Sequence, residues 1–139
     1  MDKFKSKLRF KNYIVKNVNF EYNEDFKDDS AKLDIEIDRN IEYIKNEMIV
    51  TLMVDLFSRT EKKYPFKMNV EVKGFFQIEN NDENINFEPN AIAILYPYVR
   101  AIVSTYTSNA NVMPLILPPV NVNKLLEEKE KEEKSTLKD

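Results

Sequence analysis

The chain has 139 residues and a formal net charge of −3, and charged side chains make up 32% of it. This length suits one domain with a single core, and the nearly balanced charge excludes a strongly basic nucleic-acid surface. The sequence has no cysteine, no histidine and one glycine, which excludes disulfides, zinc–thiolate sites, histidine catalysis and Gly-rich phosphate loops. We therefore expect neither a cofactor nor an enzyme.

The N-terminal third predicts two strands. Apolar residues on mostly even positions over 8–22 indicate a long first strand with one solvated face, and the alternation is imperfect at Asn12 and Lys16. A polar loop follows, in which we expect Phe26 to fold back as an anchor. A second strand is predicted over 31–44. No segment resembles a signal peptide or a membrane-spanning helix, so we expect a cytoplasmic protein without direct membrane insertion.

Three carboxylates alternate along the second strand, at Asp34, Glu36 and Asp38. They are compatible with a hard-metal or acid/base cluster. However, acidic residues that alternate with apolar ones are typical of the solvated face of a sheet. The solvated face is therefore the favoured interpretation, and no metal site is predicted.

The next two strands are predicted over 48–59 and 66–78, again with one apolar face each. The second face of the 48–59 strand is more apolar than solvent exposure requires, so we expect another element to cover part of it. Gly74 interrupts the last strand and indicates either a bulge or a close approach of another backbone. Short connections between the strands make the sheet antiparallel.

A strongly apolar run over 91–108 predicts a long helix, with Asn90 as its cap and a start or a kink near Pro97. The run is apolar on more than one side, which a helix on the surface of a monomer should not be. Burial between subunits is the simplest explanation. The expected oligomer-interface residues of this helix are Leu95, Tyr98, Ile102, Val103 and Tyr106.

An apolar loop bracketed by prolines follows over 109–119, and it cannot form a helix or a central strand. Such a loop is either buried or offered to a partner. Asn121 then caps a short C-terminal helix, and the charged residues beyond Glu127 lack an apolar stripe. The prediction is an α+β chain with a single domain over 1–127 and a disordered tail over 128–139.

Two C-terminal segments carry a family resemblance, residues 95–100 (LYPYVR) and residues 114–121 (PLILPPVN). In this order and at this distance they closely resemble the bacterial protein-export chaperone family SecB, in which an LFPYAR-like helix leads to a crossover loop ending in LPPVNF. A less specific likeness extends to strand segments 18–21, 32–35 and 74–78. The resemblance therefore covers nearly the whole chain.

The resemblance implies a tetramer built as a dimer of dimers, with the long helices between two sheets. It also implies an ATP-independent holdase whose hydrophobic grooves hold unfolded precursor proteins and deliver them to the SecA motor of the Sec translocase. Ordinary core packing of the loop remains the alternative for each groove residue. The expected client-binding groove consists of Leu33, Ile35, Val112, Met113, Leu115, Ile116 and Leu117.

The resemblance also assigns a motor-docking face to Asn17, Glu21, Lys67 and Asn69, where the family is acidic. Only Glu21 keeps that charge here. A chaperone or adaptor for one dedicated partner, such as an antitoxin, is therefore the alternative to an export function. The turn out of the helix, over 108–113, lacks the glycines of the family, but asparagine can adopt the left-handed conformation that the turn needs.

Overall fold

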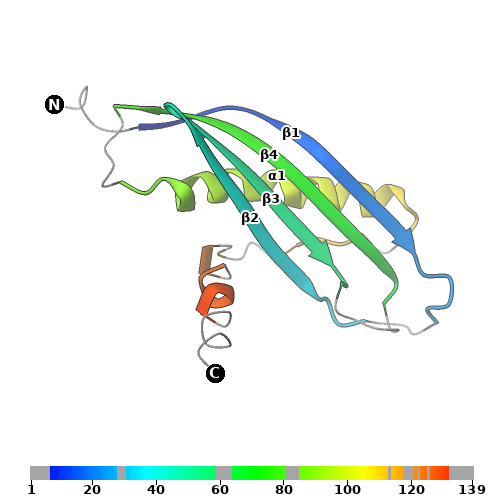
Figure 1. Cartoon of the computed structure of the whole chain (residues 1–139). Coiled ribbons are helices and arrows are strands. Elements are labelled where there is room, and N and C mark those ends of the chain that lie inside the picture. The colour runs from blue at the N-terminus through cyan, green and yellow to red at the C-terminus, as the bar shows by residue number, and fades with distance from the viewer. Residues whose placement is uncertain are drawn as a thin grey trace.

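The computed structural model describes residues 7–27, 31–58, 64–80, 85–112, 114–117, 121, 123–124 and 126–131. A four-stranded antiparallel sheet has one long helix lying along one of its faces (Figure 1). The elements are β1 (Lys7–Tyr22), β2 (Ile35–Ile44), β3 (Glu47–Leu56), β4 (Phe66–Glu79) and α1 (Glu88–Asn109). The predicted antiparallel sheet followed by a long helix is confirmed.

The strands are ordered β1-β4-β3-β2, so the first strand pairs with the last and β1 and β2 form the two edges. A two-residue turn joins β2 to β3, and Lys45 in this turn has a positive φ of 57°. The strand ends that the longer connections join, Tyr22 and Ile35 on one side and Leu56 and Phe66 on the other, fall together at the opposite end of the sheet (Figure 1). That end carries the candidate site.

Two bulges in β1 explain its imperfect alternation. The register to β4 shifts between Phe10 and Asn12 and again between Val15 and Asn17. The extra residue at each bulge is a lysine. Each lysine Nζ reaches a carboxylate on the outer face, since Lys11 lies 3.3 Å from Glu47 and Lys16 lies 3.7 Å from Glu71. The bulges therefore place two lysine side chains on the edge strand β1. Charges at an edge discourage the pairing of that strand with other chains.

The core lies between α1 and the inner faces of β3 and β4, where every second strand residue is buried. On the helix side, Leu95, Val99 and Val103 are fully buried at a spacing of four residues. Gly74 faces Leu95, so the close neighbour is a side chain and not the backbone that the sequence predicts. In β3 the second face is also covered in part, since Ile49 is only 9% exposed.

The start of α1 differs from the prediction. The helix begins at Glu88, before Asn90, and the Glu88 N–H donates to Asn86 Oδ1 at 3.1 Å. Pro89 explains this start, because its fixed φ and missing N–H suit the first helical turn. Pro97 lies inside the helix with its side chain exposed. Within the described residues, no helix is long and apolar enough to span a membrane.

Residues 123–124 and 126–131 form a second helical segment, here called the C-terminal helix, which lies to one side of the sheet near β2 (Figure 1). Asn121 Oδ1 accepts from the Lys124 N–H at 3.2 Å, as expected for a cap. Leu126 is buried in the core. The helix continues to Lys131, beyond the boundary at Glu127 that the sequence predicts, and 132–139 lie outside the described residues.

Candidate functional site

A cavity of about 320 Å³ opens at the loop end of the sheet, and we call it the apolar pocket. Three parts of the chain form its walls: the ends of strands, the loop that follows β1, and the segment that leaves α1. Of the lining residues that the structure describes, four are aromatic and none is charged. The lining residues are Tyr22, Phe26, Ala31, Phe57, Pro65, Phe66, Asn111, Val112, Pro114 and Leu115.

Phe57 and Phe66 form the inner wall of the apolar pocket. Their ring centroids lie 5.2 Å apart at an interplanar angle of 81°, an edge-to-face arrangement. Phe57 has a positive φ of 62°, which is uncommon for an aromatic residue and strains the backbone. The Phe57 N–H donates to the Asp34 carbonyl at 2.7 Å, and this bond helps to hold the strained residue in place.

Asn23 follows the lining residue Tyr22 and joins two loops beside the pocket. Its backbone N–H donates to the Pro65 carbonyl at 3.0 Å, and its Nδ2 donates to the Tyr64 carbonyl at 2.9 Å. The Asn23 carbonyl in turn accepts from the Phe26 N–H at 3.2 Å. Phe26 is half-buried in the wall and so serves as the predicted anchor of its loop.

The third wall is the segment that leaves α1. The Ala110 N–H donates to the Tyr106 carbonyl, and Asn111 then turns the chain with a φ of 59°. This left-handed asparagine does what glycine does at many helix ends, as the sequence predicts. Further along, the Leu115 N–H donates to Thr107 Oγ1 at 2.9 Å. The loop is thus bonded back onto the helix that it has just left.

Two of the predicted groove residues, Val112 and Leu115, line the apolar pocket. Ile116 lies beside them and is 73% exposed, the most exposed of the large hydrophobic side chains in the described residues. Leu117 is fully buried in the core, which is the alternative that the sequence left open for each loop residue. Met113 lies outside the described residues.

The other two predicted groove residues, Leu33 and Ile35, are half-buried and pack against the core. Neither belongs to the pocket walls that the structure describes. Leu33 lies on the segment leading into β2, and Ile35 is the first residue of β2, where it pairs with Leu56 and so faces inward. The loop prolines Pro118 and Pro119 lie outside the described residues.

Sequence reasoning missed three aromatic residues of the pocket: Tyr22, Phe57 and Phe66. Each ends, begins or directly follows a strand: Tyr22 ends β1, Phe66 begins β4 and Phe57 follows β3. In an antiparallel sheet these three strand termini fall at the same end, as Figure 1 shows. Aromatic residues placed at strand termini next to the polar loops were the signal that could have found them.

The predicted interface residues of α1 fall into two groups. Leu95 and Val103 are fully buried against the sheet of their own chain, so they differ from the interface assignment made from the sequence. The physical reason is that the helix needs an inward stripe to close the core. Tyr98 contacts Tyr13 of β1, with ring centroids 4.3 Å apart. Half-buried Ile102 lies one helical turn further along.

Tyr106 contacts Phe20 at 5.1 Å between ring centroids and is still 41% exposed. Together with Ala101, Ile102 and Thr105 it lines a depression of about 550 Å³ on the outward side of α1. The outward side of the helix therefore keeps apolar surface after the chain has folded. This surface is called the helix depression below.

The predicted docking residues Asn17, Glu21, Lys67 and Asn69 all lie on the outer face of the sheet, opposite α1. Glu21 pairs directly with Lys67 across β1 and β4, so their charges offset each other. Asn69 donates through Nδ2 to Asp55 Oδ1 on β3. Sequence reasoning missed Asp55, whose place beside Asn69 depends on the β3–β4 register.

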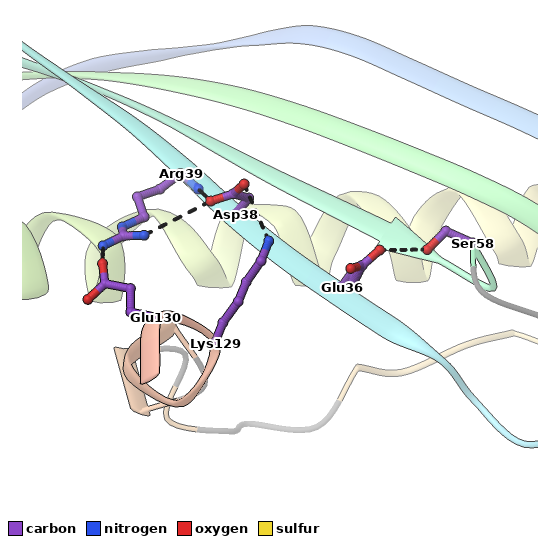
Figure 2. A network of polar contacts seen from close by, with 6 residues as sticks. All are labelled: Glu36, Asp38, Arg39, Ser58, Lys129 and Glu130. Atoms are coloured by element: carbon purple, nitrogen blue, oxygen red, sulfur yellow. Dashed lines mark hydrogen bonds and ion pairs between the residues drawn. The ribbon is translucent and has the colours of Figure 1, made fainter. Parts of the chain in front are cut away.

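Charged contacts join the C-terminal helix to β2 (Figure 2). Arg39 Nη2 contacts Glu130, and Lys129 Nζ lies 3.3 Å from Asp38 Oδ2. Nearby, Ser58 Oγ donates to Glu36 Oε2 at 3.0 Å (Figure 2). Two of the three alternating carboxylates, Glu36 and Asp38, thus have a hydroxyl and a cationic partner respectively. In the part of the chain that the structure describes, no cluster of three or more His, Cys, Asp or Glu side chains could hold a metal ion.

The electrostatic surroundings of the loop are simple. Burial raises the pKa of Tyr96 above its ordinary value, and the nearby Arg100 guanidinium opposes this rise in part. Arg100 Nε also donates to the Leu117 carbonyl at 3.0 Å. Tyr96 is therefore neutral at physiological pH, and Arg100 is the cation that contacts the loop backbone.

Comparisons with known proteins agree with this architecture. The family model described as Preprotein translocase subunit SecB matches residues 2–133. An uncharacterized protein of Methanocaldococcus jannaschii is 45% identical over 126 residues, which cover 85% of this chain and 81% of that protein. A protein-export protein SecB of Rickettsia typhi is 26% identical over 107 residues, covering 73% of this chain and 70% of that protein.

Among solved structures, a SecB-like chaperone of Mycobacterium tuberculosis has the same fold, with a TM-score of 0.66 at 14% identity. The match covers 81% of this chain and 89% of that one. The mycobacterial chaperone was solved in complex with a ChAD peptide from the HigA1 antitoxin.

Proposed function

The chain belongs to the SecB family, and we propose that it is an ATP-independent holdase chaperone that binds extended apolar segments of unfolded precursor proteins. In this proposal it keeps those precursors competent for export by the Sec translocase. It works without a cofactor and without catalysing a reaction, in the cytoplasm. The observation that carries the proposal is the apolar pocket, whose described lining residues include four aromatic side chains and no charged one.

The shape of the pocket suits one large apolar side chain of an extended client, with the backbone of the client running past Ile116. Burying one such side chain contributes about 1.5–3 kcal/mol, much of which offsets the ordering of the client. One pocket therefore binds weakly. Several pockets on one assembly raise the effective affinity without any new type of contact.

We propose a homotetramer, arranged as a dimer of dimers, as that assembly. The support is the helix depression, which leaves Ile102 and Tyr106 partly open to solvent. A second copy that covers this surface would remove apolar area from water. The outer face around Glu21 and Asp55 is then free for the SecA motor, which is the proposed export partner.

The second candidate is a chaperone or adaptor for one dedicated partner, such as an antitoxin. Two observations favour it: the similar mycobacterial chaperone was solved with an antitoxin peptide, and Lys67 offsets Glu21 on the proposed docking face. A dedicated partner requires only one client sequence to fit the pocket. A holdase must accept many, so breadth of binding separates the two functions.

The test is suppression of aggregation of two unrelated unfolded proteins, without ATP and with EDTA present. The wild-type chain should suppress both, and Val112→Asp should lose this activity because a pocket aspartate must be desolvated by the client. Asn46→Asp adds the same charge on the hairpin at the other end of the sheet and should keep the activity. Protection of neither protein contradicts the general holdase and favours the dedicated chaperone, which has to bind only its own partner.

Export is tested separately by capture of bound proteins from a cell lysate. Clients that retain uncleaved signal peptides support the export function. A single bound partner without a signal peptide favours the adaptor.

A further inference from the structure

Residues 114–117, here called the pocket loop, are bonded to α1 at two points, one on either side of an exposed residue. On one side the Leu115 N–H donates to Thr107 Oγ1 at 2.9 Å, and on the other the Leu117 carbonyl accepts from Arg100 Nε at 3.0 Å. Ile116 lies between them with 73% of its surface exposed. Residues 114–117 belong to no helix or strand, so these two bonds serve backbone groups that have no ladder partner.

Among the residues that the structure describes, Thr107 is the one polar residue that is fully buried. Its hydroxyl donates to the Val103 carbonyl at 2.8 Å and accepts from the Leu115 N–H. A valine would fill the same volume, and a carbonyl inside a helix already has its own N–H partner. Packing of the helix therefore does not explain why this position carries a hydroxyl group. The Leu115 N–H explains it, because that amide needs an acceptor.

We propose that Thr107 is a positioning residue for client binding, which fixes the backbone at Leu115 so that the apolar pocket is formed before a client arrives. The proposal rests on the proposed holdase function. A loop that is already fixed loses less conformational entropy when a client binds, and this raises affinity. Arg100 assists from the other side, where Leu117 is anchored in the core.

Ser108 provides a matched control on the same helix. Its Oγ donates to the Ser104 carbonyl at 2.8 Å, just as Thr107 Oγ1 donates to the carbonyl four residues before it. Ser108 is exposed and has no bond to the loop among the contacts of the described residues. Both hydroxyl groups bond to a helix carbonyl, but the Thr107 hydroxyl also accepts from the pocket loop and, among the described residues, the Ser108 hydroxyl does not. The experiment tests this loop contact.

The experiment compares the full-length wild type with Thr107→Val, Thr107→Ser and Ser108→Ala. The affinity is measured for a short synthetic peptide of Leu, Val and Phe, together with the melting temperature and amide hydrogen exchange at Leu115. We expect Thr107→Val to weaken peptide binding roughly three- to tenfold and to accelerate exchange at Leu115. Thr107→Ser should restore both, and Ser108→Ala should change neither.

Several results overturn the proposal. Unchanged affinity of Thr107→Val, while the wild type binds the peptide, removes the positioning role and leaves the holdase function standing. If Thr107→Val and Thr107→Ser both bind the peptide more weakly than the wild type and both lower the melting temperature to the same extent, Thr107 has a structural role only. Fast exchange of the Leu115 amide in the wild type also overturns it, whether or not the valine variant folds. A wild type that binds no peptide defeats the holdase function and this role together.

Discussion

Gly74 of β4 and Leu95 of α1 are packed so closely that a Cβ added to Gly74 would lie 2.6 Å from Leu95 Cδ2. No real Cβ is found at such a distance, so the helix lies against the sheet where the sheet has no side chain. The same helix carries Thr107 and Arg100 and ends at the apolar pocket. The depth of α1 against the sheet therefore sets the position of the loop.

We predict that Gly74→Ala destabilises the fold by about 1–3 kcal/mol, because overpacking forces Leu95 away from the sheet. Urea unfolding measures this change. In a Leu95→Ala background, which removes the clashing atoms, the same Gly74→Ala substitution should cost little. An equal cost in both backgrounds would contradict the steric explanation.

Leu115 and Leu117 should respond differently to a charge. Leu115→Asp should lower client affinity by about ten- to a hundredfold while the fold persists, because the half-buried side chain lines the pocket. Leu117→Asp should instead unfold the chain, since the residue is fully buried and an aspartate there has no partner. Peptide titration and thermal melting, measured on both variants, check this prediction. Two variants with the same phenotype would place both residues in the same environment and refute the distinction.

The C-terminal helix should be held mainly by Leu126 and only weakly by its ion pairs. Leu126→Ala should cost about 2–4 kcal/mol, as truncation of a buried leucine does. Glu130→Gln should cost less than about 1 kcal/mol, because the pair with Arg39 is partly solvated. Urea unfolding at low and high salt separates the two effects. A larger effect of Glu130→Gln than of Leu126→Ala would show that the charges hold the helix.

Light scattering tests the proposed assembly. The wild type should give about four times the 16.5 kDa chain mass at micromolar concentration. Ala101→Glu, which places a charge in the helix depression, should give a smaller species with an unchanged far-UV spectrum. Asn40→Glu carries an equal charge on an exposed position of β2 and should keep the wild-type mass. A monomeric wild type would eliminate the tetramer.

The strands and the long helix could be predicted because their apolar residues recur with the period of each element. The strand alternation over 48–59 and 66–78 matches β3 and β4 to within a few residues. The start of α1 was wrong because Asn90 is a good cap in isolation. Pro89 favours the first helical turn, and this preference places the start at Glu88.

The site was predictable only in part. Val112 and Leu115 follow from an apolar loop between prolines, a feature that is local in the sequence. Tyr22 and Phe66 could not be joined to them without the strand order, which brings together residues that are distant along the chain. The burial of Leu117 likewise depends on tertiary packing and has no local signature.

The pairing of β1 with β4 has a consequence for how the chain folds. The first strand, β1, has to wait for the last strand, β4, because β4 is its partner in the sheet, whereas β4 can pair at once with β3 on its other side. Contacts between segments distant in sequence close slowly, since the intervening chain must lose its freedom first. During synthesis β1 therefore has no partner in the sheet until β4 is made, and the charges of Lys11 and Lys16 discourage its pairing with other chains. A protein proposed to shelter unfolded chains thus passes through the same hazard itself.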